Sequence, residues 1–227
     1  MRRILGVLLL VVIVIGVFTR VIHKSSDSQT ASFNKNQYSL SNPSSIWVIV
    51  NKQRPLTPLD YKPDDLHNVG FGQKMTNKSA KDLIAMMVAA KKDKVELTFE
   101  SGYRSYEAQQ KAYQSIVNGF SQSVADKESA RPGYSEHQTG LAMDFGNDDC
   151  KVHDCFTTTK EGKWLATNSY KYGFIMRYPA DKQAITGYKE EAWHYRYVGK
   201  PLALELHKKR ISTLEEYFAI AGGGQYK

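Results

Sequence analysis

Two short segments hold the residues most capable of chemistry in this chain of 227 residues. The first, residues 135–145, contains His137 and Asp144, and the second, residues 191–197, contains His194. A catalytic zinc ion needs three protein ligands, an open position for water, and a base that takes the proton of that water. Two imidazoles, a carboxylate and further carboxylates nearby meet these needs, so the residue types predict a zinc hydrolase.

The spacing within each segment favours convergence on one metal ion. Leu141, Met143 and Phe145 alternate with Ala142 and Asp144. On a strand, the Asp144 carboxylate would therefore point away from the face that carries the three large apolar side chains. Gly140 permits a tight turn that brings His137 back beside this strand. His194 lies in a second alternating segment. We therefore predict that the two histidines and the aspartate bind one zinc ion, and that Glu190 or Glu191 is the base.

Three ordered blocks of sequence resemble those of a known family. They are Ser-Gly-Tyr-Arg-Ser at 101–105, Ser-x-His-Gln-x-Gly-x-Ala-x-Asp at 135–144, and Glu-x-Trp-His-x-Arg-Tyr at 191–197. Together they resemble the VanY-type D-alanyl-D-alanine carboxypeptidases, zinc peptidases that also include the LdcB-type L,D-carboxypeptidases and the VanX dipeptidases. The resemblance runs from about Trp47 to about Glu215.

The resemblance assigns roles to the residues of the blocks. It implies that His137, Asp144 and His194 are the zinc ligands, and that Glu191 rather than Glu190 is the catalytic base.

The same resemblance places Arg104 near the scissile bond, in both a catalytic and a substrate-binding role. A guanidinium there can pair with a substrate carboxylate or with the oxyanion as it forms. Gln109 and Ser135 are implied to be further substrate contacts.

The implied activity is removal of the C-terminal D-alanine from peptidoglycan stem peptides. The alternatives are L,D-carboxypeptidase activity on tetrapeptide stems, peptidoglycan endopeptidase activity, and a non-catalytic wall-binding module with a structural metal. Structural zinc sites usually have four protein ligands, whereas three are found here, which argues against the module. A serine-type peptidase is excluded, because Ser-x-x-Lys occurs only at 32–35, in a polar stretch, without a Lys-Thr-Gly partner.

The N-terminal sequence predicts a targeting segment followed by a linker. An apolar run at 4–18 follows two arginines, so we predict a signal anchor over residues 1–23, with a cleaved signal peptide as the alternative. Residues 24–45 are polar and predict a linker, residues 46–220 the catalytic domain, and residues 221–227 a flexible tail. We expect the domain at the outer face of a bacterial membrane or in the wall, secreted if the signal is cleaved.

The net charge and the length of the chain limit the binding partners that we expect. Half of the formal net charge of +8 lies in residues 1–45, so the remainder is only mildly basic. No basic stripe with interleaved aromatic residues is present, which argues against nucleic acid, whereas an anionic wall polymer fits. The length suits one domain, and we take the chain to be a monomer.

The only two cysteines, Cys150 and Cys155, are close in sequence. Outside the cell such a pair most simply forms a loop-closing disulfide. The alternative is a metal site that adds His153, but it would need a fourth ligand and a reducing compartment.

Hydrophobic periodicity predicts an α+β domain with a small antiparallel sheet flanked by helices. The predicted helices cover 79–92 (with Ser79 as its cap), 106–118, 164–172 and 201–219, and the predicted strands cover 47–50, 95–99, 141–145, 174–178 and 193–198.

Overall fold

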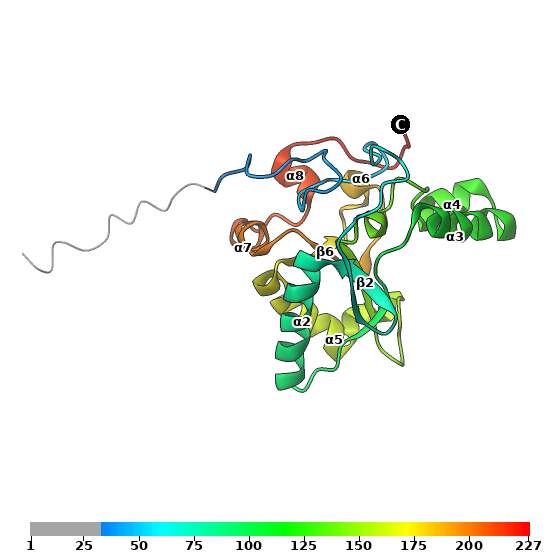
Figure 1. Cartoon of the computed structure of the whole chain (residues 1–227). Helices are drawn as coiled ribbons and strands as arrows, with labels where there is room; N and C mark the ends of the chain where they lie inside the picture. The colour runs from blue at the N-terminus through cyan, green and yellow to red at the C-terminus, as the bar shows by residue number, and fades with distance from the viewer. Residues whose placement is uncertain (1–32) are drawn as a thin grey trace, which may run out of the picture. The chain divides into compact units, whose positions relative to one another are not determined.

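The computed structural model describes residues 33–227, of which Lys35–Lys227 form one compact unit (Figure 1). The helices of this unit are α2 (Asn77–Lys92), α3 (Tyr106–Gly119), α4 (Gln122–Glu128), α5 (Lys160–Asn168), α6 (Gln183–Thr186), α7 (Lys200–Lys209) and α8 (Leu214–Phe218), with 3-10 turns η1 (Glu136–Thr139), η2 (Asp154–Thr158) and η3 (Ser169–Tyr172).

A four-stranded antiparallel sheet lies at the centre of the unit. Its strands are β3 (Thr98–Ser101), β4 (Ala142–Gly146), β5 (Phe174–Tyr178) and β6 (Glu191–Tyr197), in the spatial order β3-β4-β6-β5. A separate hairpin joins β1 (Leu66–Gly70) to β2 (Gln73–Thr76). The α+β class with a small antiparallel sheet is therefore confirmed, although the sequence analysis missed the hairpin, α4 and α6. The two central strands, β4 and β6, contain two of the three predicted zinc ligands, Asp144 and His194.

Helix α2 begins earlier, and presents a different face, than the sequence analysis predicted. Thr76 is its N-cap, whereas Ser79 is buried one turn inside and donates its hydroxyl to the carbonyl oxygen of Thr76 at 3.0 Å. The buried side chains of α2 include Leu83 and Met86, which join the core cluster with Phe145 of β4. Ile84 and Val88, expected on the apolar face, point to solvent and are half exposed.

Other element boundaries moved by a few residues. The strand expected over 95–99 is displaced toward its C-terminal end as β3, and β6 begins two residues before the expected 193. The helix expected over 164–172 is α5 followed by η3, which ends at Gly173.

The segment at 47–50 is buried but is not the predicted strand. Its backbone groups do not pair with a neighbouring strand: the N–H groups of Val48 and Ile49 donate to the carbonyl oxygens of Ser45 and Leu40, and the carbonyl oxygen of Val48 accepts from Arg196 Nη2 at 2.7 Å. Trp47 also donates from its indole nitrogen to the carbonyl oxygen of Val198 at 2.9 Å. The chain before it packs as well, since Tyr38 lies edge-on to Trp47, so the folded unit begins before the expected residue 46.

The predicted membrane anchor at 1–23 and the first part of the linker lie outside the described residues. Within residues 33–227, no helix has the length and apolar character needed to cross a membrane.

The single helix predicted over 201–219 is two helices, α7 and α8. Arg210 ends α7 in a left-handed conformation, with φ of 55°. Thr213 then caps α8: its hydroxyl accepts a hydrogen bond from the backbone N–H of Glu216 and donates to the carboxylate of the same residue. This break is what allows Glu215 to reach the interior.

The last residues pack against the unit and do not form the loose tail that the sequence predicts. The Tyr226 hydroxyl accepts a hydrogen bond from the backbone N–H of Arg131 at 3.0 Å, and the Arg131 guanidinium covers the Tyr226 ring. The backbone N–H of Lys227 donates to the carbonyl oxygen of Lys52.

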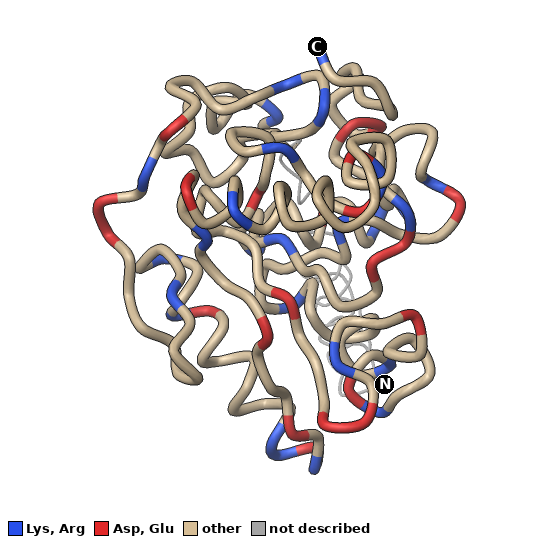
Figure 2. Tube along the Cα trace, turned by 90° about the vertical axis from the view of Figure 1, so that its right-hand side faces the viewer, with Lys and Arg blue, Asp and Glu red and all other residues tan. Residues whose placement is uncertain are grey.

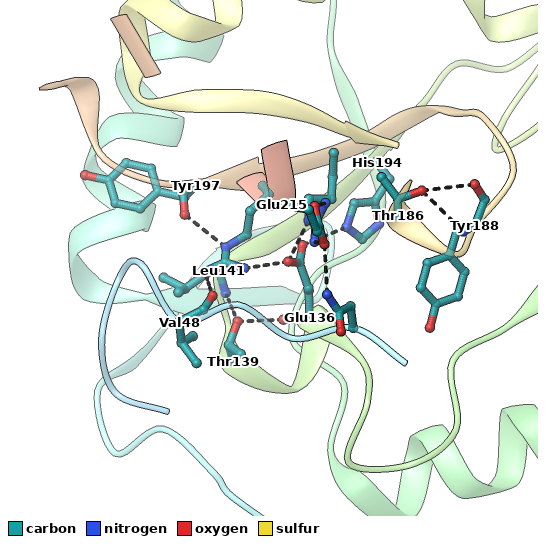
Figure 3. A network of polar contacts seen from close by, with 12 residues as sticks. Val48, Glu136, Thr139, Leu141, Thr186, Tyr188, His194, Tyr197 and Glu215 are labelled. Atoms are coloured by element: carbon teal, nitrogen blue, oxygen red, sulfur yellow. Dashed lines mark hydrogen bonds and ion pairs between the residues drawn. The ribbon is translucent and has the colours of Figure 1, made fainter. Parts of the chain in front are cut away.

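Acidic and basic residues are interspersed along the trace (Figure 2), yet several lie in the interior as an ion network. One oxygen of Glu136 accepts from Arg177 Nε at 2.8 Å and from Arg196 Nη1 at 2.6 Å. Arg177 also donates both terminal nitrogens to Glu215, which accepts a further bond from Asn51 (Figure 3). All four charged side chains are buried, so the network ties η1, β5, β6 and α8 together in the interior.

This network predicts a loss of stability in acid. Burial alone would raise the pKa of Glu215, but Arg177 and Asn51 hold the pKa below its usual 4.5. The pKa of Glu136 is likewise lowered, against burial, by Arg177 and Arg196. Both shifts stabilise the fold above pH 4.5, and the stabilisation is lost as the pH falls below that value, because the unfolded chain then binds more protons. Urea unfolding of chelator-treated protein between pH 7 and pH 3 measures this loss.

The substitution Glu215→Gln is the test of its origin. It should cost about 3–5 kcal/mol at pH 7 and flatten the acid dependence, since it leaves Arg177 without its full partner. The neighbouring Glu216→Gln removes an exposed pair with Lys182 and should cost at most about 1 kcal/mol. Equal costs for the two variants would contradict a stabilising role for the buried network.

Candidate zinc centre

The register of the two central strands brings two predicted ligands together. Asp144 of β4 and His194 of β6 are direct partners in the antiparallel pair. Side chains of directly opposed residues lie on the same face of a sheet, with Cβ atoms about 5 Å apart. Asp144 Oδ1 accordingly lies 2.9 Å from His194 Nδ1. Both side chains are buried, with exposed fractions of 8% and 3%.

The predicted base reaches the same face because β6 is irregular. Met176 pairs with Tyr195 and Tyr178 with Glu191, so two residue steps on β5 oppose four steps on β6. In a regular strand, residues three apart point to opposite faces, and the extra residues of a bulge re-aim such a side chain. Glu191 Oε2 therefore lies 3.7 Å from His194 Nδ1, on the ligand side of the strand.

The third ligand comes from the turn before β4. His137 lies on η1, which ends at Gly140 with φ of 66°. A side chain at Gly140 would be strained in this conformation and would meet Leu66 and Thr76 at 3.0–3.1 Å. The turn places His137 Nε2 at 3.2 Å from Asp144 Oδ2, while Nδ1 of the same ring lies 2.8 Å from the carbonyl oxygen of Gly102.

These three side chains fit a zinc ion. Among the described residues, they are the group of histidines and carboxylates placed to share a metal, with one ligand atom each within 4.8 Å of one another. Although Asp144 Oδ1 lies 2.9 Å from His194 Nδ1, the two atoms do not form a hydrogen bond, so this buried oxygen has no partner, a cost that a bound cation removes. Two imidazole nitrogens and one carboxylate oxygen form a donor set that zinc accepts in catalytic sites. The residues present therefore suit the metal.

The electrostatics of the site also favour a cation. Burial alone would raise the pKa of Asp144, but the neighbouring His137 and His194 hold the pKa well below its usual value, so the carboxylate stays charged. Burial lowers the pKa of His137, which keeps this imidazole in the neutral form that binds metals. A buried anion beside a neutral imidazole is an arrangement that attracts a divalent ion.

Glu191 differs from Asp144 in its protonation. Burial raises the pKa of Glu191 to about 7, with His194 opposing the rise and Asp144 adding to it. A carboxyl group with this pKa can both accept and return a proton near neutrality, which is what a general base and acid requires. Glu190, the alternative base, is exposed and does not line the site.

Arg104 lies in the same cavity, held by two neighbours. It follows β3 and donates to Ser101 Oγ at 2.7 Å and to Gln109 Oε1 at 3.0 Å. Gln109 in turn donates its amide to the carbonyl oxygen of Ala130 at 2.7 Å. The amide of Gln109 is thus engaged with the protein, so the structure gives it a positioning contact to Arg104. Ser135 is buried at the start of η1 and lines the cavity.

The cavity that contains the site has a volume of about 640 Å³. Besides the predicted residues, its wall includes Tyr178, Tyr188 and Lys189, which the sequence analysis did not select. Tyr178 lies against His194, with ring centroids 4.9 Å apart. Tyr178 reaches the cavity through the pairing of β5 with β6, whereas Tyr188 and Lys189 lie in the connection between α6 and β6, and no local sequence pattern marks any of the three.

The cysteine loop forms another part of the wall. Cys150 and Cys155 are joined by a disulfide, so they are not part of a second metal site with His153. His153 and Asp154 line the cavity from this loop.

Comparison with known proteins agrees with this geometry. Residues 72–200 match the family model described as VanY, D-alanyl-D-alanine carboxypeptidase. The protein YodJ of Bacillus subtilis (strain 168) is 40% identical over 218 residues, which cover 86% of this chain and 79% of that protein.

Solved structures show the same likeness. The LdcB LD-carboxypeptidase superposes with a TM-score of 0.72 at 40% identity, covering 79% of this chain and 88% of that one. The vancomycin-resistance D,D-pentapeptidase VanY, solved with Zn(II), superposes with a TM-score of 0.66 at 34% identity, covering 75% and 97%. The family match spans the ligands, the base and Arg104. The chain therefore belongs to the VanY family of D-alanyl-D-alanine carboxypeptidases, whose members are zinc-dependent peptidases.

Proposed function

We propose that this protein is a zinc-dependent D-alanyl-D-alanine carboxypeptidase that removes the terminal D-alanine from peptidoglycan stem pentapeptides. The observation that supports it most is the convergence of His137, Asp144, His194 and Glu191 on one face of the sheet, in a cavity that also contains Arg104. A metal site with a base hydrolyses a peptide bond, and a fixed guanidinium beside it selects the end of a chain that has a free carboxylate.

Glu191 performs the proton transfers in this proposal. When bound, zinc supplies Lewis acidity that polarises the peptide carbonyl and makes water a better nucleophile. The Glu191 carboxylate accepts the proton of the attacking water and then gives it to the nitrogen of the departing D-alanine. With its pKa raised by burial to about 7, the group suits both steps.

Arg104 recognises the carboxylate end of the substrate. A guanidinium has five N–H donors, and the bonds to Ser101 and Gln109 fix its plane while leaving donors for a ligand. Because these contacts hold the group before substrate arrives, less side-chain entropy is lost on binding. The same donors can stabilise negative charge on the carbonyl oxygen during attack.

The second candidate is L,D-carboxypeptidase activity on tetrapeptide stems. It is favoured by the likeness to LdcB, which has a higher TM-score and a higher identity than the D,D-pentapeptidase VanY. The two activities differ in the chirality of the residue before the cleaved bond. The zinc ligands, Glu191 and Arg104 would serve both.

Replacement of the base should separate catalysis from metal binding. Glu191→Gln removes the proton acceptor but no zinc ligand, so we expect kcat to fall by about 10²–10⁴-fold while zinc content is retained. Turnover of a stem pentapeptide and metal analysis by atomic emission measure the two quantities. The adjacent Glu190→Gln is the matched control and should leave both unchanged. Full activity in the Glu191 variant would rule this residue out as the base.

Mass spectrometry of purified stem peptides tests the substrate. With zinc present, we expect the pentapeptide to lose one alanine and the tetrapeptide to remain intact, and a chelator should abolish the reaction. Loss of alanine from the tetrapeptide alone would replace the D,D assignment with the L,D assignment. Internal cleavage of cross-linked dimers, with neither terminal reaction, would indicate an endopeptidase.

The same assay tests Arg104. The cavity should discriminate against a pentapeptide whose C-terminal carboxylate is amidated, since the guanidinium then loses its ionic partner. In Arg104→Lys, the bidentate contact is lost, so KM for the free acid should rise and the penalty for amidation should shrink. An unchanged penalty would mean that another group recognises the carboxylate.

We further propose that residues 1–23 anchor the protein and that the domain acts as a monomer at the outer face of a bacterial membrane. The support is the apolar run at 4–18 with its preceding arginines, and the expected wall substrate. Membrane fractionation of the full-length chain should recover it in the membrane pellet at the monomer mass. Recovery of a shortened chain in the medium would favour a cleaved signal peptide instead.

A further inference from the structure

The two histidine ligands differ in the group that faces the ring nitrogen not used for the metal. A histidine that binds a metal through one ring nitrogen almost always donates the N–H of the other to a fixed acceptor, which sets the tautomer and the ring orientation. For His137 this acceptor is the carbonyl oxygen of Gly102, 2.8 Å from Nδ1. His194 faces Asp144 with Nδ1, so its Nε2 needs an acceptor on the opposite side of the ring.

The group opposite His194 Nε2 is the carboxylate of Glu136. Its Oε2 lies 3.6 Å from Nε2, and both side chains are fully buried. Neither atom has a hydrogen-bond partner among the described residues. Buried polar atoms without partners are costly, and here a ring nitrogen and a carboxylate oxygen, both without partners, lie 3.6 Å apart.

The ion network determines which oxygen of Glu136 is left for the histidine. Arg177 and Arg196 both donate to Oε1, at 2.8 and 2.6 Å. Oε2 is the oxygen that remains, and it points to His194 (Figure 3). Asp144 and Glu136 thus face the two different nitrogens of the His194 ring, Nδ1 and Nε2.

The carboxylate is also prevented from turning away. Arg177 is held by two bonds to Glu215, at 2.7 and 2.9 Å. Arg196 is held by the carbonyl oxygen of Val48 at 2.7 Å. Because both arginines are fixed by other partners, the position of Glu136 is set before a metal binds.

We propose that Glu136 is a positioning residue for the zinc site: it accepts the Nε2–H of His194 and so presents Nδ1 of that ring to the metal. The inference rests on the metal site and not on the choice of substrate in the proposed function. It assigns a role to a residue that lies between Ser135 and His137 and is not one of the three zinc ligands.

Zinc affinity, measured without substrate, is the direct test. In Glu136→Gln the carboxylate acceptor is replaced by an amide of nearly the same volume, and we expect the zinc Kd to rise by about 10–100-fold, as is usual when the outer partner of a ligand is lost. Glu215→Gln is the matched comparison, because it loosens Arg177 but leaves Glu136 Oε2 and the bond from Arg196 to Glu136 in place, so its Kd should rise much less than that of Glu136→Gln. Competition with a chromophoric chelator gives both values, and melting of the zinc-free variants checks their folding.

The control decides between positioning and general support. If Glu215→Gln weakens zinc binding as much as Glu136→Gln, the network acts only through stability and the proposal is wrong. An unchanged Kd in Glu136→Gln overturns it as well. These results do not depend on which stem peptide is cleaved, so they leave the proposed function to its own assay.

A second measurement uses the unaltered chain, in case a variant does not fold. In the zinc-loaded protein, ¹H–¹⁵N correlations through the two-bond couplings of the imidazole identify which nitrogen carries the proton. We expect His194 to be protonated at Nε2, with Nδ1 on the metal. Protonation of His194 at Nδ1 would show that the ring is turned the other way, and the proposal would fail.

Discussion

One buried carboxylate shared by two arginines is the interaction on which the arrangement of the site depends. Glu136 lies beside the ligand His137 in sequence and is bound by Arg177 of β5 and Arg196 of β6. It therefore fixes the turn that carries one ligand to the two strands that form the site wall. Removing a partner from a buried ion pair leaves an uncompensated charge, which costs several kcal/mol, so each member constrains the others. The geometry of the zinc centre follows from this constraint.

The network is balanced in charge and nearly complete in hydrogen bonds. Two guanidinium groups face two carboxylates, and Arg196 also donates to the carbonyl oxygens of Ile46, Val48 and Tyr197. An apolar core of similar volume could be as stable, so stability alone does not account for such a cluster. What ions add is direction: each bond specifies an angle as well as a distance. A zinc ligand set needs directional support of this kind, because small displacements of a ligand alter metal geometry.

The sequence predicts correctly those parts of the site that are determined by residues near to one another in the chain. Gly140 and the alternation that follows it indicate a turn and a strand, and both place Asp144 beside His137. The strand predicted at 174–178 is confirmed as β5, because it too was predicted from its own residues alone. By contrast, the side of β6 on which Glu191 lies depends on a bulge against β5, and the partners of Glu136 are 41 and 60 residues away. The interior strand predicted at 47–50 is wrong because the backbone there bonds to Ser45 and Leu40 and to the distant side chain of Arg196, and not to a neighbouring strand.

Strand β6 connects the chemistry to this support through its alternation. His194 and Arg196 lie on the same face, two residues apart, and pair with Asp144 and Ala142 of β4. His194 thus contributes a zinc ligand, and Arg196, the next residue on that face, contributes a positive charge to the ion network. A shift of β6 by one residue would remove both from the interior together, so the pairing that builds the site is also the one that satisfies the buried charges. The energy of the ion network therefore opposes any register in which Asp144 and His194 are separated.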